Sequence, residues 1–369
     1  MNNAVIYIGK YSPVFMGILD TCIKNQFEDI IFIETSPFKS SLTKGLCKAH
    51  FNIKEAVNIH ERLLKIANEY SQVYCLSLSY NDTLNLHILE AQANNIKVLG
   101  ASASCIEILL NKEKMNDLAE QAGLPLLSTI NITDKNVANF FPLVLRPKDE
   151  NNATFKAEYI NDDKALQCFL SMDVVAQPFI SGPTIVIHIT RFSSDFTFEC
   201  FIARNKFEGV TLTLEKYLLN DDLLISQIKK FLELTNFSGV GHFEFIQDDL
   251  NSKCYFLDFN GRFGGTSLKA ATLGFNEFFQ YLSYLMPITF KKEDQVDNTI
   301  VSNTLSLLKC IKILITKEKS ILDYPQKSKL TYCLYLIYIL IIGKNELNYP
   351  AWPINKDYFV NLLKRKLQK

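Results

Sequence analysis

Three polar side chains stand two residues apart near the end of an apolar strand pattern. Asp258, Asn260 and Arg262 alternate with Phe259 and a glycine within residues 255–265. Alternate side chains of an extended chain share a face, so Asp258 and Asn260 would lie roughly 7 Å apart on one side while Leu257 and Phe259 point into a core. Carboxylate and amide oxygens are the hard donors that Mg2+ prefers. The spacing therefore predicts two oxygen ligands on one strand face.

An earlier strand pattern, residues 239–245, carries Glu244, and an acidic turn at residues 248–251 separates the two stretches. If they form a hairpin, Glu244 can lie on the same face and supply a third oxygen donor. If the chain stays extended as far as Arg262, its guanidinium joins them, and such a cation spreads charge during phosphoryl transfer. The alternative is a half-buried hairpin with a solvated acidic edge.

Composition excludes several classes of protein. The chain has 369 residues, 48% of them hydrophobic, so two or three packed domains are expected. The 39 basic and 39 acidic residues cancel, which leaves no overall basic field for nucleic acid. Nine cysteines without a Cys-x-x-Cys pair indicate neither a disulfide framework nor a zinc site. No signal-peptide pattern is present, and we expect a cytoplasmic protein.

The first hundred residues alternate between strand and helix patterns. Apolar strand-like runs cover residues 4–8, 30–33 and 73–78, with helix-like stretches at 14–25, 55–70 and 83–95. This order predicts a parallel sheet with crossover helices, a Rossmann-like domain. Its first turn lacks Gly-x-Gly-x-x-Gly, so NAD or FAD is not expected. Ser79 and Asp82 follow the third strand, where open sheets place ligands, although Asp82 is more simply a helix N-cap.

The two strands carrying Glu244 and Asp258 resemble the metal-binding signature of the ATP-grasp ligases. In that family a Glu or Gln strand and a turn precede Glu-x-Asn-x-Arg, and here Asp258 stands in place of the second Glu. Residues 266–274 are similar to the segment that follows the motif in the carbamoyl-phosphate-synthetase-like branch. The resemblance implies that Glu244, Asp258 and Asn260 hold Mg2+, with Mn2+ as a second candidate. It also implies that Arg262 is the catalytic cation.

Three further stretches resemble the ATP-binding parts of that family. Residues 104–122 read as one helix ended by Gly123, residues 141–148 as the phosphate-holding strand, and residues 174–182 as the adenine-holding hinge strand. The residues that would bind ATP on this resemblance are Lys112, Arg146, Lys148, Gln177, Pro178 and Ile180. Their plainer interpretations are a solvated helix lysine, an exposed strand-end arginine and an ordinary buried strand.

The resemblance implies a fold and an activity. The fold is of the α/β and α+β classes, with a Rossmann-like pre-ATP-grasp domain over residues 1–105. An ATP-grasp A subdomain follows over 106–182, a B subdomain with the metal site over 183–290, and a mostly helical extension over 291–369. The activity is an ATP-dependent carboxylate–amine ligase that forms an amide through an acyl phosphate and releases ADP and phosphate. Amino acids are the expected substrates, and a homodimer is considered.

Departures from the family pattern keep a second function open. Residues 149–155 contain no glycine where the family has a Gly/Ser-rich phosphate loop. Asn111 replaces the usual Asp before Lys112, and Thr184 stands where a ribose-binding Glu is common. These differences motivate the alternative of a nucleotide-binding module that has lost catalysis.

The C-terminal extension contains an uncharged stretch, residues 330–343, between Lys329 and Lys344. A helix of this length covers about 21 Å, which is short of the roughly 30 Å hydrocarbon layer. Three interpretations stay open: a helix buried in the protein, a dimer contact, or shallow peripheral contact with the inner membrane surface. The basic residues 364–366 favour an anionic surface in the third case.

Overall fold

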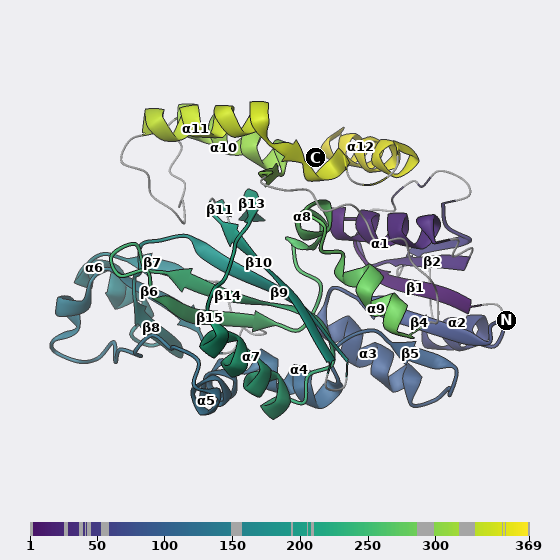
Figure 1. Cartoon of the computed structure of the whole chain (residues 1–369), viewed down its shortest axis with the longest axis horizontal. Coiled ribbons are helices and arrows are strands. Elements are labelled where there is room, and N and C mark those ends of the chain that lie inside the picture. The colour runs from purple at the N-terminus through teal and green to yellow at the C-terminus, as the bar shows by residue number, and fades with distance from the viewer. Residues whose placement is uncertain are drawn as a thin grey trace.

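The structure, a computed structural model, describes most of the chain. The described residues are 3–25, 29–36, 40, 42, 46–52, 59–148, 157–192, 195–204, 206–207, 210–285, 299–316, 329–348, 350 and 352–367. They form a parallel sheet at one end of the molecule, a larger antiparallel sheet in the middle and a small sheet at the other end (Figure 1).

The N-terminal sheet is parallel, as its alternating pattern predicts, with strand order β3-β2-β1-β4-β5. Its strands are β1 (Asn3–Gly9), β2 (Asp29–Glu34), β3 (Ala49–Asn52), β4 (Gln72–Ser77) and β5 (Ile96–Val98), with helices α1 (Pro13–Lys24), α2 (Ile59–Ala67) and α3 (Tyr80–Glu90). The short strands β3 and β5 were not predicted, because three or four residues are too few for a clear period-two pattern.

The central sheet has seven strands in the order β15-β14-β9-β10-β13-β16-β17. Its strands are β9 (Thr184–Phe192), β10 (Asp195–Ala203), β13 (Thr213–Lys216), β14 (Gly239–Gln247), β15 (Cys254–Asn260), β16 (Val301–Ser302) and β17 (Lys344–Asn345). Asp195 begins β10 opposite Phe192, the last residue of β9. One face packs on α4 (Ala103–Leu110), α5 (Lys112–Ala122) and α7 (Asp222–Leu234) through a cluster rich in phenylalanine.

The stretch predicted as one helix over residues 104–122 is two helices, so that prediction was wrong. Asn111 has an extended backbone between α4 and α5 and is the cap of both. Its side chain accepts a hydrogen bond from the Lys114 backbone N–H at 3.0 Å, as an N-cap does. The second helix ends at Gly123 in the left-handed conformation, as the sequence predicts. The break places Lys112 in the first turn of a new helix.

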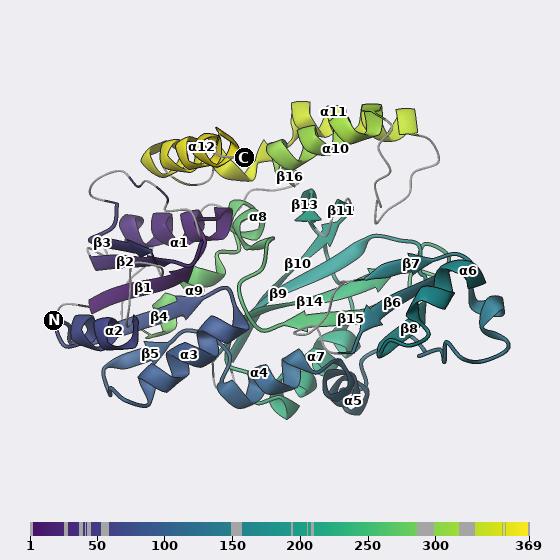
Figure 2. The ribbon, with the colours of Figure 1, turned by 180° about the vertical axis from the view of Figure 1, so that it is seen from behind.

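The third sheet has strand order β7-β6-β8 and a core of its own. It contains β6 (Leu143–Pro147), β7 (Glu158–Ile160) and β8 (Val174–Pro178), with the short helices η2 (Val137–Phe140), α6 (Asp163–Leu166) and η3 (Gln167–Phe169). A separate ribbon joins β11 (Lys206–Phe207) to β12 (Val210–Thr211). Seen from behind, the small sheet and the parallel sheet lie at opposite ends of the molecule (Figure 2).

The last part of the described chain is largely helical and closes one edge of the central sheet. It contains α8 (Ser267–Thr272), α9 (Glu277–Leu285), α10 (Thr304–Thr316), α11 (Lys329–Ile342), η4 (Glu346–Asn348) and α12 (Trp352–Leu367). Strands β16 and β17 join the sheet that residues 183–290 begin, and the domain boundaries at 105, 182 and 290 stay predictions. No described helix is both long enough and apolar enough to cross a membrane.

A buried ion pair fastens this C-terminal part to the sheet domain. The Lys269 ammonium on α8 lies 2.8 Å from the Glu346 carboxylate on η4, and each side chain is 1% exposed. Asn303, just before α10, donates a second hydrogen bond to Glu346. The Lys269 ammonium is therefore held inside the protein by this pair.

We predict that Lys269→Met lowers the free energy of unfolding by about 3–5 kcal/mol, because it leaves the Glu346 charge buried without its partner. Lys269→Met/Glu346→Gln should recover much of that loss while keeping an acceptor for Asn303. The measurement is urea unfolding, with the exposed Lys230→Met as a control expected within about 0.5 kcal/mol of wild type. Equal stability of Lys269→Met and the control would contradict the assigned role of the pair.

Candidate active site

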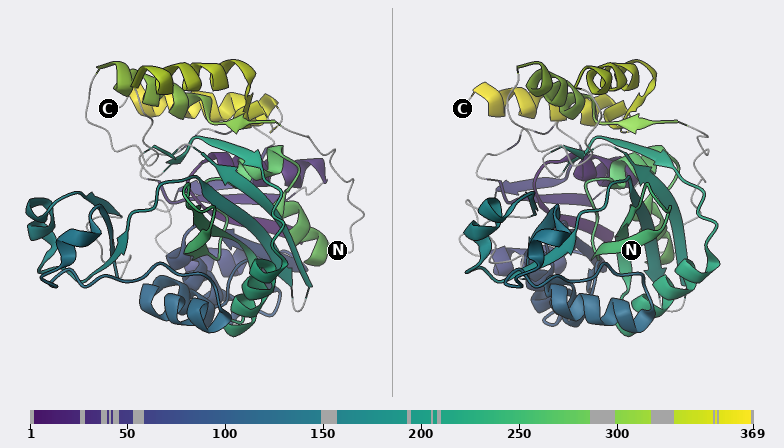
Figure 3. Two further views of the ribbon diagram at one scale, coloured as in Figure 1. Left: turned by 60° about the vertical axis from the view of Figure 1, so that its left-hand side comes forward. Right: turned by 90° about the vertical axis from the view of Figure 1, so that its left-hand side faces the viewer.

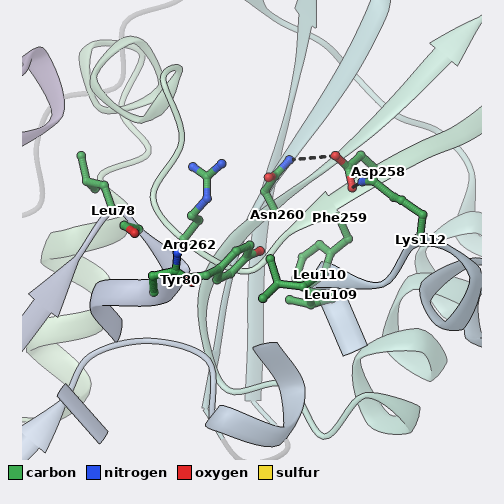
Figure 4. Close-up of a pocket in the computed structure, with 11 residues that line it drawn as sticks. Leu78, Tyr80, Leu109, Leu110, Lys112, Asp258, Phe259, Asn260 and Arg262 are labelled. Atoms are coloured by element: carbon green, nitrogen blue, oxygen red, sulfur yellow. Dashed lines mark hydrogen bonds and ion pairs between the residues drawn. The ribbon is translucent and has the colours of Figure 1, made fainter. Parts of the chain in front are cut away.

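A cavity of about 300 Å3 lies where the N-terminal sheet meets the central sheet. Its walls come from the loop after β4, the junction of α4 and α5, and the end of β15 (Figure 4). The lining residues are Leu78, Ser79, Tyr80, Asn81, Leu109, Leu110, Lys112, Asp258, Phe259, Asn260 and Arg262. Five of the candidate residues from the sequence are therefore in one cavity: Ser79, Lys112, Asp258, Asn260 and Arg262.

The two strands form the expected hairpin, and its register sets the oxygen donors together. Glu244 on β14 is directly opposite Asp258 on β15, and His242 is opposite Asn260. Directly opposed side chains share a sheet face with Cβ atoms about 4.5–5.5 Å apart. The Asn260 amide donates to Asp258 Oδ2 at 3.4 Å, which leaves its amide oxygen as the atom for a metal (Figure 4).

A β-bulge in this hairpin changes which residues of β15 enter the core. Glu244 pairs with Asp258, but the next residue of β14, Phe245, pairs with Phe256. Leu257 is therefore the extra residue of β15. Phe256 and Phe259 are each 1% exposed, whereas Leu257 is only half-buried. The expectation that Leu257 points into the core was wrong, because strict alternation fails at a bulge.

Lys112 contacts the predicted metal ligand Asp258 directly. Its ammonium lies 2.6 Å from Asp258 Oδ1, and the lysine is 5% exposed. The extended backbone at Asn111 directs α5 so that its first residue reaches across to β15. This lysine is therefore a buried cation at the carboxylate, and not the solvated helix lysine of the alternative interpretation.

Arg146 reaches the same strand from the small sheet. Its Nη1 donates to the Leu257 carbonyl at 3.0 Å, a group that the bulge removes from regular strand pairing. Its Nε is buried and has no hydrogen-bond partner within the described residues. A buried guanidinium N–H without an acceptor suits an anion such as a phosphate oxygen, because leaving such a donor unsatisfied is costly.

The structure leaves Lys148 outside the cavity. Its ammonium lies 2.7 Å from Glu113 and 3.2 Å from Asp173, on a partly exposed surface. The hydrogen bond to Glu113 and then that to Asp173 raise the pKa of Lys148, so the lysine is charged at neutral pH. Its assignment to ATP stays a prediction, and these contacts give it no support.

The edge strand β8 has the backbone orientation expected for an adenine-binding hinge. Phe179 N–H donates to the Pro142 carbonyl at 2.9 Å, so the neighbouring Leu143–Pro178 pair is a non-hydrogen-bonded pair of the ladder. The Pro178 carbonyl therefore points away from β6, toward the outer edge of β8. On the same edge the Ile130 N–H donates to the Ala176 carbonyl. Gln177 is buried, and Ile180 lies two residues past the end of β8.

Tyr80 is the cavity residue that sequence reasoning missed. Its hydroxyl accepts the Gly261 N–H at 2.8 Å, and the Arg262 guanidinium lies 5.5 Å from the centre of its ring. Burial raises the pKa of the phenol, which keeps it neutral. Because β15 ends at Asn260, Arg262 is not held by strand pairing, and Tyr80 provides that support. Its position just after a buried strand was the available signal.

In the loop after β4, the residue that caps α3 differs from the predicted one. Ser79, and not Asp82, is the N-cap of α3: its hydroxyl accepts from the Asp82 N–H at 3.4 Å. Desolvation raises the pKa of the Asp82 carboxyl. Ser79 lines the cavity, while Asp82 hydrogen-bonds to Ser77.

His242 is a packed histidine. It is 5% exposed and stacks on His188 with ring centres 5.5 Å apart, and its Nε2 lies 3.7 Å from Glu244. His188 in turn contacts Glu277 at 2.7 Å and Thr266 at 2.9 Å. This network lies on the same sheet face as the predicted metal ligands, next to Asn260. Thr184 is buried at the start of β9, and the glycine-free stretch 149–155 lies outside the described residues.

Comparisons with known proteins identify the fold. No protein-family model and no curated protein sequence matches the chain. Among solved structures, N5-carboxyaminoimidazole synthetase from Staphylococcus aureus has a TM-score of 0.65 at 14% identity over 85% of each chain. Biotin carboxylase from Campylobacter jejuni, as an ATP complex, has a TM-score of 0.61 at 16% identity, over 80% of this chain and 74% of that one. This chain has the ATP-grasp fold.

A third ATP-grasp structure was determined with nucleotide. The biotin carboxylase domain of the Hydrogenobacter thermophilus 2-oxoglutarate carboxylase is a dimer in complex with MgADP, ADP and bicarbonate. It has a TM-score of 0.61 at 12% identity, and the match covers 80% of this chain and 73% of that chain. At these identities the likeness shows the ATP-grasp fold alone. The roles of individual residues follow from their positions in the cavity.

We predict that Tyr80→Phe lowers the free energy of unfolding by about 1–3 kcal/mol, because the buried Gly261 N–H loses its acceptor. The ring is retained, so the contact with Arg262 survives. Urea unfolding gives the difference, and Tyr159→Phe, on an exposed tyrosine of β7, is the matched control. If both variants unfold at the wild-type midpoint, the hydroxyl is not a support of the β15 end.

Proposed function

We propose that this chain is an ATP-dependent ligase that joins a carboxylate to an amine, with release of ADP and phosphate. The observation that carries the proposal is the pairing of Glu244 with Asp258 on one sheet face. Asn260 lies on that face, and Lys112 and Arg262 line the adjoining cavity. Hard oxygen donors next to two cations are the groups that phosphoryl transfer uses.

The nucleotide would lie between the small sheet and the central sheet. Its adenine would bind along the outer edge of β8, at the Pro178 carbonyl, beside the buried Gln177 and the Ile180 N–H. Arg146 would direct its unsatisfied Nε to a phosphate, since a guanidinium can hold phosphate oxygens through two parallel bonds. Lys112 would contribute a second positive charge from the start of α5.

Bringing two anions together is the physical difficulty of such a reaction. In the first step a carboxylate oxygen of the substrate attacks the γ-phosphorus, and the bond from that phosphorus to the β–γ bridging oxygen breaks, so ADP leaves. In the second step the amine nitrogen attacks the acyl carbon, phosphate leaves and the amine loses a proton to solvent. Lys112 and Arg262 would offset the repulsion and fix the groups in line, so no side chain has to act as a nucleophile.

The oxygen donors fit a divalent metal, here Mg2+ or Mn2+. No three His, Cys, Asp or Glu side chains gather into a metal site anywhere in the described part of the chain. The metal would therefore be held by Glu244, Asp258 and the Asn260 amide oxygen together with nucleotide phosphates. When bound, it would neutralise phosphate charge and strengthen the electrophilic character of the γ-phosphorus.

A nucleotide-binding module without catalysis is the second candidate. Two observations favour it: Asn111 serves as a helix cap where the family has Asp, and Lys148 is held by two carboxylates away from the cavity. Such a module would bind MgADP but release no ADP from ATP with any carboxylate and amine. A screen of amino acids and other carboxylates against amines, read by ADP release and mass spectrometry of the product, separates the two candidates.

We predict that Asp258→Asn lowers the rate of ADP formation by roughly 10²-fold or more, because the carboxylate charge next to the transferred group is lost. The side-chain volume is retained, and circular dichroism should remain that of wild type. Asp117→Asn, on the exposed side of α5, is the matched control and should turn over normally. Unchanged turnover by the Asp258 variant would refute the metal assignment.

Arg262→Lys and Arg262→Ala test the predicted catalytic cation. We expect kcat to fall roughly 10²-fold or more for Arg262→Ala and less for Arg262→Lys, which keeps the charge but not the planar fork. The dissociation constant for ATP, measured by calorimetry, should change less than about threefold, a difference of under 1 kcal/mol. A large loss of ATP affinity with normal kcat would instead place Arg262 at the nucleotide.

A further inference from the structure

Helix α11 has two apolar faces, and within the described part of the chain only one of them is packed. Tyr332, Leu336 and Ile339 are at most 1% exposed and join α10 in a core cluster. The opposite face carries large side chains with high exposed fractions. These are Leu330 at 71%, Leu334 at 58%, Ile337 at 42%, Tyr338 at 53%, Ile341 at 77% and Ile342 at 47%. An apolar stripe of this length is unusual for a surface helix.

Helix α10, which packs against α11, also has exposed apolar side chains and carries positive charge. Leu308 is 50% and Ile315 is 68% exposed, and the exposed Lys309 and Lys312 stand among them. Lys344 follows directly after α11 and is exposed. Residues 304–316 and 329–342 contain no aspartate or glutamate. We call the exposed apolar residues of α10 and α11, with these three lysines, the outer face.

The outer face lies on a part of the molecule away from the cavity. Helices α10, α11 and α12 form a layer along one side, and the views from two further directions agree with this (Figures 1 and 3). The helices around the cavity, α3, α4 and α5, are on the opposite side of the central sheet (Figure 1). A surface could therefore contact the layer without covering the cavity.

We propose that the outer face binds an anionic lipid surface, with α11 lying in the plane of the membrane interface. Charge complementarity supports this occupant: an apolar stripe with lysines next to it matches acyl chains beneath negatively charged head groups. The 14 residues of α11 are too few to span a bilayer but suit a helix that lies flat. Lysines at the margin can extend their ammonium groups to the head groups while their methylenes follow the apolar face.

A second copy of the chain fits the outer face less well. A two-fold contact sets the same patch against itself, so Lys309 and Lys312 would face lysines of the other copy. The two helices offer no carboxylate to pair with them. Repulsion of like charges therefore disfavours this dimer, whereas an anionic membrane attracts the lysines.

The test is co-sedimentation of the full-length protein with vesicles. One set contains equal parts of phosphatidylcholine and phosphatidylglycerol, and the other contains phosphatidylcholine alone. We expect at least about tenfold stronger binding to the anionic vesicles, given about 1 kcal/mol for each lysine near the surface, and weaker binding as salt rises. Leu334→Gln/Ile341→Gln should reduce binding at least about tenfold, and Lys309→Glu/Lys312→Glu should remove the preference for anionic lipid.

Matched controls use exposed leucines elsewhere on the molecule. Leu250 is 94% and Leu218 is 81% exposed, so Leu218→Gln/Leu250→Gln removes apolar groups that are more exposed than Leu334 and Ile341 and should bind like wild type. All substituted side chains are on the surface, and circular dichroism should confirm the fold. Absence of wild-type binding to anionic vesicles would overturn the proposal, as would equal loss of binding in the control. A dimer in light scattering that Leu334→Gln/Ile341→Gln dissolves, without vesicle binding, would show that a second copy covers the face.

Discussion

The register of the β14–β15 hairpin is the constraint on which the rest of the site depends. Phe243 and Phe259 are the chain neighbours of Glu244 and Asp258, and they pair in the aromatic core. Because these phenylalanines pair, Glu244 lies opposite Asp258. Because side chains alternate along a strand, a slip of one residue would send carboxylates into that core and phenylalanines to the cavity. The core therefore specifies the position of the oxygen donors as strictly as it specifies the fold. Burial of the phenylalanines is what makes the alternative pairing too costly.

Sequence patterns predicted the parallel sheet and the hairpin with Asp258 and Asn260, because these depend on local periodicity, whereas Lys112 was predicted from the family resemblance. The contacts that join separate elements were not predictable in that way. Arg146 contacts the carbonyl of Leu257, and that carbonyl is available only because of a bulge. Tyr80 meets Gly261 across 181 residues of chain. The break at Asn111 was readable in principle, since Asn is a common N-cap, but the apolar pattern continues through it.

In this ATP-grasp fold the three sheets contribute different residues to the site. The N-terminal sheet contributes the Ser79–Asn81 wall, the small sheet contributes Arg146 and the edge of β8, and the central sheet contributes the oxygen donors. None of the described residues of the C-terminal helices lines the cavity, but the buried Lys269–Glu346 pair links η4 to α8, which follows strand β15 of the central sheet. Their outer face, with its apolar residues and lysines, lies away from the cavity. The proposed membrane contact and the proposed reaction would therefore occur on opposite sides of the central sheet.

The most direct measurement of the central claim is a crystal structure of the protein with Mg2+ and a non-hydrolysable ATP analogue. The account predicts a divalent ion about 2.0–2.1 Å from oxygens of Asp258 and Asn260, with the triphosphate alongside Arg146 and Lys112 and the adenine at the Pro178 carbonyl. A nucleotide bound elsewhere would contradict it, as would a metal that none of Glu244, Asp258 and Asn260 holds.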